Sequence, residues 1–341
     1  SRASTFNAEN VWPLKCLRLR HGRVFSWSVS KRKLMLVFSA ACTLSQPHDR
    51  DRAGDSRYLD RAGGGCGARA GRAQAGSDGD LRSVGCLDRQ PAARHLAGSA
   101  ALFAQKNKKC LVIDLDPQGN ATTGLGLSNT QSSEKTIYSV LNGNKKITEV
   151  IQPTKFENLS LISSNVDLSG LEVETAGDSR RAFKLKDELM ALIHDSRASY
   201  EYVLIDCPPS LSLLTIMALV ASNEILVPLQ TEFFALEGLT QLIKTIERIK
   251  SNLNPSLNIR GILLTMFDKR NNLSSQVESE ARNYFKDKVY LSVVPRNVRL
   301  SEAPSHGIPV LVYDKSCPGS KAYFKLTDEF LDQDKLEVTA A

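Results

Sequence analysis

Three aspartates stand directly after short apolar runs, where a carboxylate is well placed to do chemistry. Asp114 and Asp116 follow the run Cys110–Ile113, and Asp206 follows Tyr202–Ile205. A carboxylate at a strand end can hold a hydrated Mg²⁺ or orient a water for attack on a phosphate. The alternative role is to cap the helix that comes next. Taken one at a time, these residues favour the capping role.

The elements that must position these aspartates are visible as alternating apolar patterns after residue 100. Runs of strand length, rich in Val, Ile and Leu, occur at Cys110–Ile113, Leu159–Ile162, Tyr202–Ile205, Ile225–Leu229, Ile262–Thr265 and Val289–Val294. Helical patterns lie between them, at residues 182–194, 236–249 and 274–285. Strands alternating with helices predict one α/β domain with a doubly wound, mainly parallel sheet. Ligands of such sheets bind beyond the carboxyl ends of the strands, which is where the aspartates stand.

Composition is typical of a globular protein but separates the two ends of the chain. The 341 residues are 42% hydrophobic and 24% charged. Residues 1–100 hold 17 Lys and Arg against 8 Asp and Glu, whereas the remaining residues hold 27 against 29. The net charge of +7 therefore belongs to the N-terminal stretch. The seven cysteines have no CxxC spacing, which disfavours a disulfide scaffold or a cysteine metal site. No apolar run is long enough to span a membrane.

Longer motifs surround the aspartates. The chain contains, in this order, KNKKCLVIDLDPQGNATTGLG (Lys106–Gly126), YEYVLIDCPPSLSLLTIMAL (Tyr200–Leu219) and VVPRNVRLSEAPSHGIPV (Val293–Val310). Together they resemble the ParA/Soj family of chromosome- and plasmid-partitioning ATPases, which are deviant-Walker P-loop NTPases of the SIMIBI type. The likeness runs from about Ser99 to Phe330 and outweighs the preference for simple helix caps. It implies ATP and Mg²⁺ as ligands, ATP-dependent homodimers, nonspecific DNA binding and a ParB-type partner that stimulates hydrolysis.

The resemblance assigns roles to the residues at the strand ends. Asp116 matches the acid that positions the attacking water, and Asp114 is its companion at the same strand end. Asp206 matches the Walker B acid, which holds Mg²⁺ through a water. Pro208 lies in the switch that follows and is implied to contact the nucleotide.

Two further groups of residues match family positions outside the carboxylate motifs. Pro295 and Asn297 stand where the family contacts the adenine ring and the ribose. Arg270 and Arg299 match positions that bind DNA nonspecifically, and Lys269 lies beside the first of them. Arginine suits this role because its planar fork makes two charge-assisted hydrogen bonds to a phosphate.

The phosphate-binding loop of the family, KGGxGKT, has no counterpart in this sequence. By family spacing it should lie near positions 85–95, but Val84–Arg94 reads VGCLDRQPAAR, and no Gly-Lys pair occurs in the 341 residues. The Walker A lysine is therefore missing. We expect the first strand and the P-loop to be absent and the chain to bind ATP very weakly, with negligible turnover.

The N-terminal stretch resembles no part of the family. Residues 1–97 are rich in Arg, Gly and Ala, and we expect a disordered or mistranslated segment there. The ATPase-like domain is predicted at residues 98–335 and a tail at 336–341. Basic Lys31–Lys33 followed by apolar Leu34–Cys42 is similar to a signal peptide, but the run is short and begins over thirty residues into the chain. The resemblance implies a cytoplasmic, nucleoid-associated protein.

Other interpretations stay open from the sequence. One is a non-enzymatic remnant that keeps a DNA- or protein-binding surface, including a nonspecific basic arm at the N-terminus. Another is a MinD-like ATPase associated with a membrane. This relative needs a basic amphipathic helix at the C-terminus, whereas Ala322–Ala341 is acidic, so anionic lipid should repel it.

Overall fold

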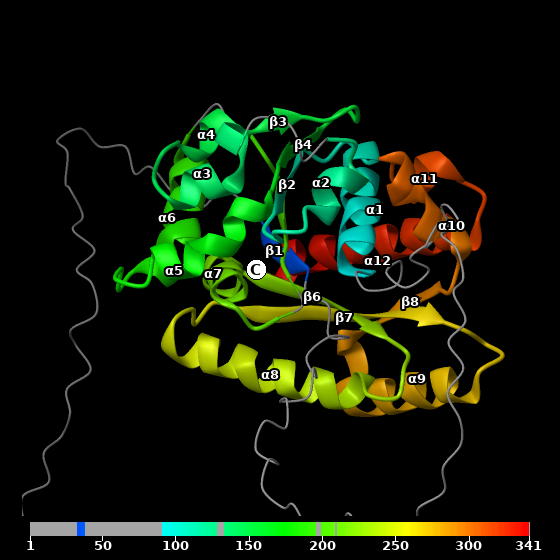
Figure 1. Cartoon of the computed structure of the whole chain (residues 1–341). Helices are drawn as coiled ribbons and strands as arrows, with labels where there is room; N and C mark the ends of the chain where they lie inside the picture. The colour runs from blue at the N-terminus through cyan, green and yellow to red at the C-terminus, as the bar shows by residue number, and fades with distance from the viewer. Residues whose placement is uncertain (1–32, 38–90, 128–132, 196–198, 209, 341) are drawn as a thin grey trace, which may run out of the picture. The chain divides into compact units, whose positions relative to one another are not determined.

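A single eight-stranded sheet organises the part of the chain that is described. The computed structural model describes residues 33–37, 91–127, 133–195, 199–208 and 210–340. The strands are β1 (Lys33–Val37), β2 (Cys110–Asp114), β3 (Gln152–Pro153), β4 (Leu159–Ile162), β5 (Tyr202–Asp206), β6 (Glu224–Gln230), β7 (Asn258–Phe267) and β8 (Val289–Pro295). They are ordered β3-β4-β2-β5-β1-β6-β7-β8, and every neighbouring pair is parallel except β3 and β4 (Figure 1).

Helices cover both faces of this sheet. The longer ones are α1 (Pro91–Gln105), α6 (Lys184–His194), α7 (Leu213–Ala221), α8 (Ala235–Asn252), α9 (Asn272–Phe285) and α12 (Pro318–Ala340). Shorter ones are α2 (Asn120–Gly124), α3 (Ile137–Leu141), α4 (Ile147–Val150), α5 (Leu171–Glu174), α10 (Val298–Glu302), α11 (Val310–Tyr313) and the 3₁₀ turn η6 (Ala303–His306). None of the described helices has both the length and the hydrophobicity that a bilayer-spanning segment needs.

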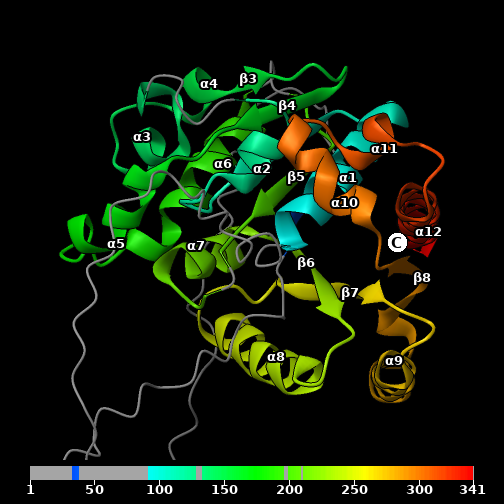
Figure 2. The ribbon, with the colours of Figure 1, turned by 45° about the vertical axis from the view of Figure 1, so that its right-hand side comes forward.

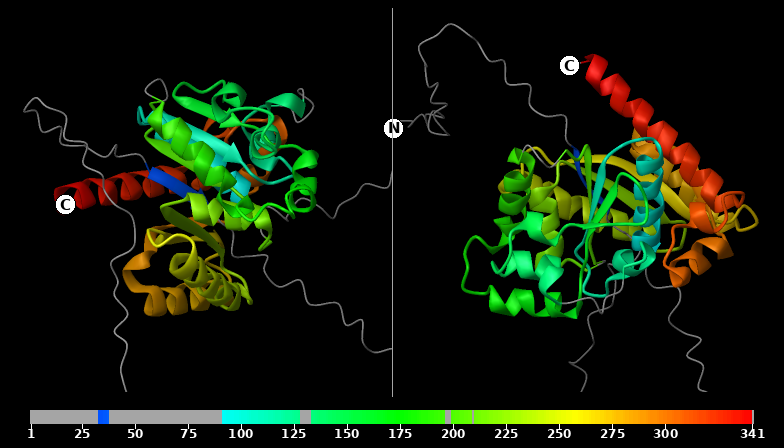
Figure 3. Two further views of the ribbon diagram at one scale, coloured as in Figure 1. Left: turned by 90° about the vertical axis from the view of Figure 1, so that its left-hand side faces the viewer. Right: turned by 90° about the horizontal axis from the view of Figure 1, so that it is seen from above.

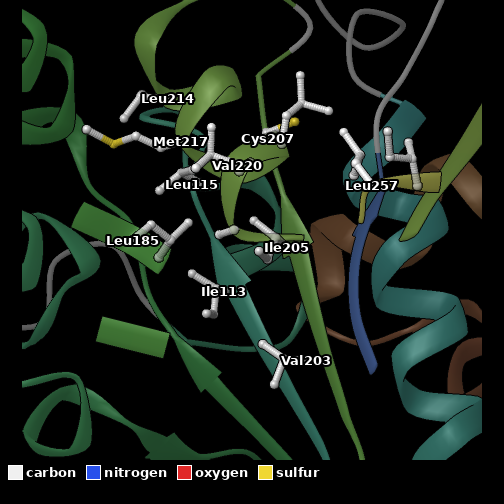
Figure 4. Close-up of a cluster of buried hydrophobic side chains, with 14 of the residues drawn as sticks. Ile113, Leu115, Leu185, Val203, Ile205, Cys207, Leu214, Met217, Val220 and Leu257 are labelled. Carbon is white, nitrogen blue, oxygen red and sulfur yellow. The ribbon is translucent and has the colours of Figure 1, made fainter. Parts of the chain in front are cut away.

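The two faces of the sheet carry separate hydrophobic cores because successive side chains of a strand point in opposite directions. Along β2, Leu111 and Ile113 belong to the core under α3, α4 and α6–α9, whereas Cys110 and Val112 belong to the core under α1 and α12. Figure 4 shows the first core, where Ile113 lies near the β5 side chains. Helices α1 and α12 run beside each other on the second face (Figure 3). Burial on both faces explains why these strands read as continuous apolar runs.

Most of the predicted elements are confirmed. The six apolar runs lie within β2, β4, β5, β6, β7 and β8. The helical stripe at 236–249 lies in α8, the pattern at 274–285 lies in α9, and that at 182–194 spans a 3₁₀ turn and α6. The doubly wound, mainly parallel fold is therefore as predicted.

The centre of the sheet differs from the prediction. We expected the first strand to be absent, but β1 lies between β5 and β6 and pairs in parallel with both. Its residues, KLMLV, include the start of the run that is similar to a signal peptide, and an apolar run suits a strand between buried neighbours. The expectation that the sheet lacks a strand at this position is therefore wrong.

The described elements also extend past the predicted domain limits. Helix α1 begins at Pro91, ahead of the predicted boundary at 98, and α12 continues through the predicted tail to Ala340. Residues 1–32 and 38–90, which make up most of the segment predicted to be disordered or mistranslated, lie outside the described residues.

Candidate functional site

Two of the predicted aspartates lie at paired positions on neighbouring strands. Asp114 ends β2 and Asp206 ends β5, and the two residues are opposite each other in the parallel register. Asp114 is 0% and Asp206 is 1% exposed, and Asp116, two residues beyond Asp114, is 5% exposed. The sheet thus brings the three carboxylates together at one edge, away from solvent.

Asp114 is fixed by hydrogen bonds to both of its oxygens. Oδ1 accepts from the backbone N–H of Asp116 at 3.1 Å, and Oδ2 accepts from the N–H and the hydroxyl of Thr122 at 2.7 Å each. The Thr122 oxygen in turn accepts from the N–H of Ser164, just after β4, at 3.1 Å. The buried Thr122 hydroxyl therefore ties the ends of β2 and β4 together through α2. Sequence reasoning missed Thr122, although it lies within the quoted DPQGNATTGLG motif.

Asp116 opens the tight turn that leads into α2. Its Oδ1 accepts from the N–H of Gln118 at 3.0 Å, and its carbonyl oxygen accepts from the N–H of Gly119 at 2.9 Å. Gly119 has φ +63°, a left-handed conformation that glycine adopts without steric cost. The next residue, Asn120, has a buried amide nitrogen with no hydrogen-bond partner among the described residues. The turn thus presents a second polar group that sequence reasoning did not single out.

The electrostatics of this site favour a cation. Burial raises the pKa of Asp114 to about 7 and also raises the pKa of Asp116. The pKa of Asp206 is raised well above its usual range, first by burial and then by the charges of Asp114 and Asp116. The ion pairs formed by the described residues include none of these three carboxylates. Their negative charges are therefore not compensated by a described side chain.

A metal at this edge would rest on few protein ligands. Among the described residues, no three His, Cys, Asp or Glu side chains are grouped so that they could hold a metal ion by themselves. Asp206 nevertheless has a buried oxygen, Oδ1, with no hydrogen-bond partner in the described part of the chain. This arrangement is what a hydrated Mg²⁺ needs, because Mg²⁺ keeps several waters and takes only one or two carboxylates.

The residues predicted to contact the nucleotide are spread along the same edge. Pro208 is buried two residues after Asp206, and its carbonyl lies 3.4 Å from the Thr215 hydroxyl. Pro295 ends β8, which lies four strands from β5 and is therefore roughly 19 Å away across the sheet. Asn297 caps α10, where its side-chain oxygen accepts from an N–H at 2.9 Å. The structure thus places Pro295 and Asn297 at the carboxylate edge but not beside the carboxylates.

Helix α2 is joined to the segment that follows Asn297 by a close approach of two backbones. Gly126 (φ +81°) comes just after α2, and a Cβ on it would lie 2.8 Å from the carbonyl oxygen of Gly307 (φ +62°). Figure 2 shows α2 beside the α10 segment. The C-terminal end of α2, the helix that follows the Asp116 turn, is therefore packed against the end of the α10–η6 segment.

The cations predicted to bind DNA follow the ends of β7 and β8, which are neighbours in the sheet. Arg270 is 89% exposed and makes two hydrogen bonds to Asp268, at 3.0 and 2.9 Å, which hold the pKa of Asp268 down to about 2. Arg299 is half exposed and bonds Glu302 at 2.8 Å. Lys269 is exposed. Both arginines are thus accessible, but a phosphate would compete with a carboxylate that sequence reasoning missed.

The chain is similar to known proteins over about two thirds of its length. Residues 96–259 match a family described as an AAA domain. The chain is 50% identical over 233 residues to the chromosome partitioning protein ParA of Caulobacter vibrioides, which covers 68% of this chain and 86% of that protein. It is 45% identical over 234 residues to the chromosome-partitioning ATPase Soj of Treponema pallidum, covering 69% and 89%.

A solved structure agrees with this relationship. Cobyrinic acid a,c-diamide synthase from Mycobacterium smegmatis, with a bound ATP analog and magnesium, superposes with a TM-score of 0.61 at 28% identity and covers 74% of this chain and 93% of that chain. The fold is therefore that of the P-loop NTPases, and the identity to the two partitioning proteins extends over most of their length. This chain belongs to the ParA/Soj family of chromosome-partitioning ATPases.

Proposed function

We propose that this chain is a ParA/Soj-type partitioning ATPase by descent. It has kept the three aspartates of the site but has lost the phosphate-binding loop and, with it, most of its affinity for the nucleotide. The observation that carries the proposal is the trio Asp114, Asp116 and Asp206, buried together at the strand ends with no cation paired to them among the described residues. Mg²⁺ and ATP are the ligands that the resemblance implies. The residues present suit Mg²⁺ but not the phosphates of ATP.

The carboxylate side fits a magnesium ion. Asp206 offers an unpaired buried oxygen, and the charges of Asp114 and Asp116 add to burial in raising the pKa of Asp206. Asp206 would hold the hydrated ion, and Asp114 would stay fixed by Thr122 and by the Asp116 N–H. A bound Mg²⁺ would supply positive charge against the carboxylates. Asp116 would be left to orient a water.

The phosphate side does not fit. Phosphates need a cradle of backbone N–H groups and a lysine, and the sequence has no Gly-Lys pair. Phosphate oxygens brought next to three buried carboxylates without that lysine would be repelled. We therefore expect a Kd for Mg-ATP weaker than about 1 mM and negligible hydrolysis.

Two measurements test ATP binding and Mg²⁺ binding separately. Calorimetry with Mg-ATP should give no saturable binding below millimolar concentrations, with a related Soj ATPase as the positive control. A micromolar Kd would overturn the proposal. Mg²⁺ alone, at millimolar concentration and about pH 8, should raise the melting temperature of the wild-type chain but not that of Asp206→Asn. An equal rise in both proteins would show that the ion binds elsewhere.

A second function, from a non-enzymatic class, is DNA binding without nucleotide. Its support is the pair of accessible arginines, Arg270 and Arg299, at the ends of adjacent strands with Lys269 beside them. Replacing both arginines with alanine should weaken binding to duplex DNA by tenfold or more at low salt. The slope of affinity against salt concentration should also fall by about 1 for each phosphate that the variant no longer neutralises.

A matched control separates this patch from general charge. Arg248 is exposed on α8, away from these strand ends, so Arg248→Ala should leave DNA binding unchanged. An equal loss in that variant, or no loss in the double variant, would rule out the patch.

The remaining family partners follow from the same proposal. Without nucleotide binding the chain should stay monomeric when ATP is added, since the implied homodimer depends on ATP. A ParB-type partner would then dock without stimulating hydrolysis. We propose a cytoplasmic, nucleoid-associated location in preference to a MinD-like membrane location, because the last helix is acidic. Vesicles of anionic lipid should not retain the protein.

A further inference from the structure

The strand at the centre of the sheet comes from outside the part of the chain that matches the family. The family match begins at residue 96, yet Lys33–Val37 forms β1 between β5 and β6. Five residues of β1 are in parallel register with Tyr202–Asp206, and three are in register with Glu224–Leu226. A segment outside the matched region thus completes the hydrogen-bonding ladder of the sheet.

The gap that β1 fills has strict requirements. Strands β5 and β6 lie on either side of it, about 9.5 Å apart, and both are buried along their middle residues. Backbone N–H and C=O groups on their facing edges need partners, since water cannot reach them there. Residues of β5 alternate between the two cores, with Val203 in one and Leu204 in the other. The occupant must therefore be a parallel strand of about five residues that tolerates burial on both faces.

The sequence places a long interval between β1 and the next described element. Val37 ends the strand and the next described residue is Pro91, so the link spans residues 38–90. Links between a strand and the next helix in α/β folds are usually 2–6 residues long and set the strand position themselves. A strand tethered through a long link has only a modest effective concentration at its binding site. We therefore attribute the position of β1 to its pairing with β5 and β6.

We propose that the gap between β5 and β6 is a donor-strand site that binds the segment Lys33–Val37 as an exchangeable strand. Binding uses the backbone pairing of β1 with β5 on one edge and with β6 on the other, as in recognition by strand addition. The same segment, offered as a separate peptide, occupies the gap when the strand of the chain itself cannot. The proposal does not depend on ATP or DNA binding.

A full-length variant with a disabled strand tests this site. Leu36→Pro removes a backbone donor in the middle of β1, where the strand is paired on both edges. A fluorescent peptide of residues 31–38, KRKLMLVF, should bind this variant saturably and raise its melting temperature. The wild-type chain should bind the peptide at least about tenfold more weakly, because its gap is filled. The control peptide carries the same proline and should bind neither chain.

Two results would overturn the proposal in that experiment. One is a Leu36→Pro chain as stable as the wild type. The other is equal peptide binding by both chains.

A crosslinking measurement tests whether β1 lies next to β5, and it does not require the proline variant to fold. Met35 is the register partner of Leu204 on β5, whereas Val112 lies on β2, one strand further away. In full-length chains, mild oxidation should crosslink Met35→Cys with Leu204→Cys but not Met35→Cys with Val112→Cys. The chain with only its natural cysteines gives the background. Equal crosslinking of the two pairs, or crosslinking of neither, would show that the strand does not occupy this gap.

Discussion

Asp114 and Asp206 end adjacent strands at paired positions, and the charge of Asp114 adds to burial in raising the pKa of Asp206. Both side chains are 1% or less exposed, so water screens this repulsion poorly. The folded chain therefore binds protons at this site more tightly than the unfolded chain does. A cation at the site would serve the same purpose as those protons.

This relationship predicts an unusual dependence of stability on pH. Asp114 has a folded-state pKa of about 7, against an unfolded value near 3.9, so the folded state holds the extra proton between these limits. The contribution of Asp114 to the free energy of unfolding should be highest below about pH 4. It should fall by on the order of 3–4 kcal/mol as the pH rises to about 7. Urea denaturation followed across this range measures it.

The variant Asp206→Asn should remove the part of the pH dependence that comes from Asp206 itself, whose pKa is also raised in the folded chain. It removes one buried charge from the pair, so the free energy of unfolding at about pH 8 should rise by about 1–3 kcal/mol relative to wild type, with little difference at about pH 4. Asp287→Asn changes an exposed aspartate and should change the profile little. A destabilised Asp206→Asn chain at about pH 8 would contradict the repulsion that we infer.

Thr122 should stabilise the folded chain mainly through the hydrogen bonds of its hydroxyl and less through the volume that it fills. Thr122→Val removes a donor to Asp114 and an acceptor for the Ser164 N–H, and it should cost about 2–3 kcal/mol because the site is buried. Thr122→Ser keeps the hydroxyl and should cost about 1 kcal/mol or less. The hydrogen bond from the hydroxyl lowers the pKa of Asp114, so an NMR titration should show a higher pKa in the valine variant alone. Equal stability of the two variants would exclude this role.

A buried ion pair binds the last helix, α12, to the sheet at the end of the strands away from the three aspartates. Arg260 on β7, whose side chain is 3% exposed, bonds Asp334 of α12 at 2.5 Å, and the Tyr202 hydroxyl donates to the same carboxylate at 2.6 Å. Asp334→Leu should cost about 3–5 kcal/mol, because it leaves the buried guanidinium with less compensation. On the same helix, Asp332→Leu breaks an exposed pair with Lys335 and should change stability by about 0.5 kcal/mol or less. Thermal unfolding of both variants distinguishes the two sites, and equal losses would mean that burial does not decide the cost.

These interactions show what the sequence could and could not predict. The strands and the three aspartates were predictable because a doubly buried parallel strand reads as an apolar run and ends where polar residues resume. The partnership of Arg260 with Asp334 joins residues 74 positions apart, so no local pattern reports it. The role of Thr122 depends on α2 folding back over its strand. Strand β1 was missed because its residues resemble no family motif, and the gap that selects them is made by strands far along the chain.

The close approach of Gly126 to Gly307 is open to a test that separates backbone strain from packing. Gly126→Ala should cost about 3 kcal/mol or more, because the new Cβ would lie 2.8 Å from the Gly307 oxygen and the residue must also keep φ +81°. Gly143→Ala has a similar φ of +87° but nothing within 4 Å, so it should cost only the conformational term, about 1–2 kcal/mol. Chemical denaturation of the two variants gives the difference.

The contact between Gly126 and Gly307 joins two segments of the candidate site. It packs the end of α2, which follows the Asp116 turn, against the segment that carries Arg299. If Gly126→Ala forces the two apart, the amide NMR signals of Gly119 and of Arg299 should both shift, whereas Gly143→Ala should leave both in place. A Gly126→Ala chain that is destabilised no more than Gly143→Ala would mean that the two backbones are free to separate at no cost, and the turn and the arginine would then be mechanically independent.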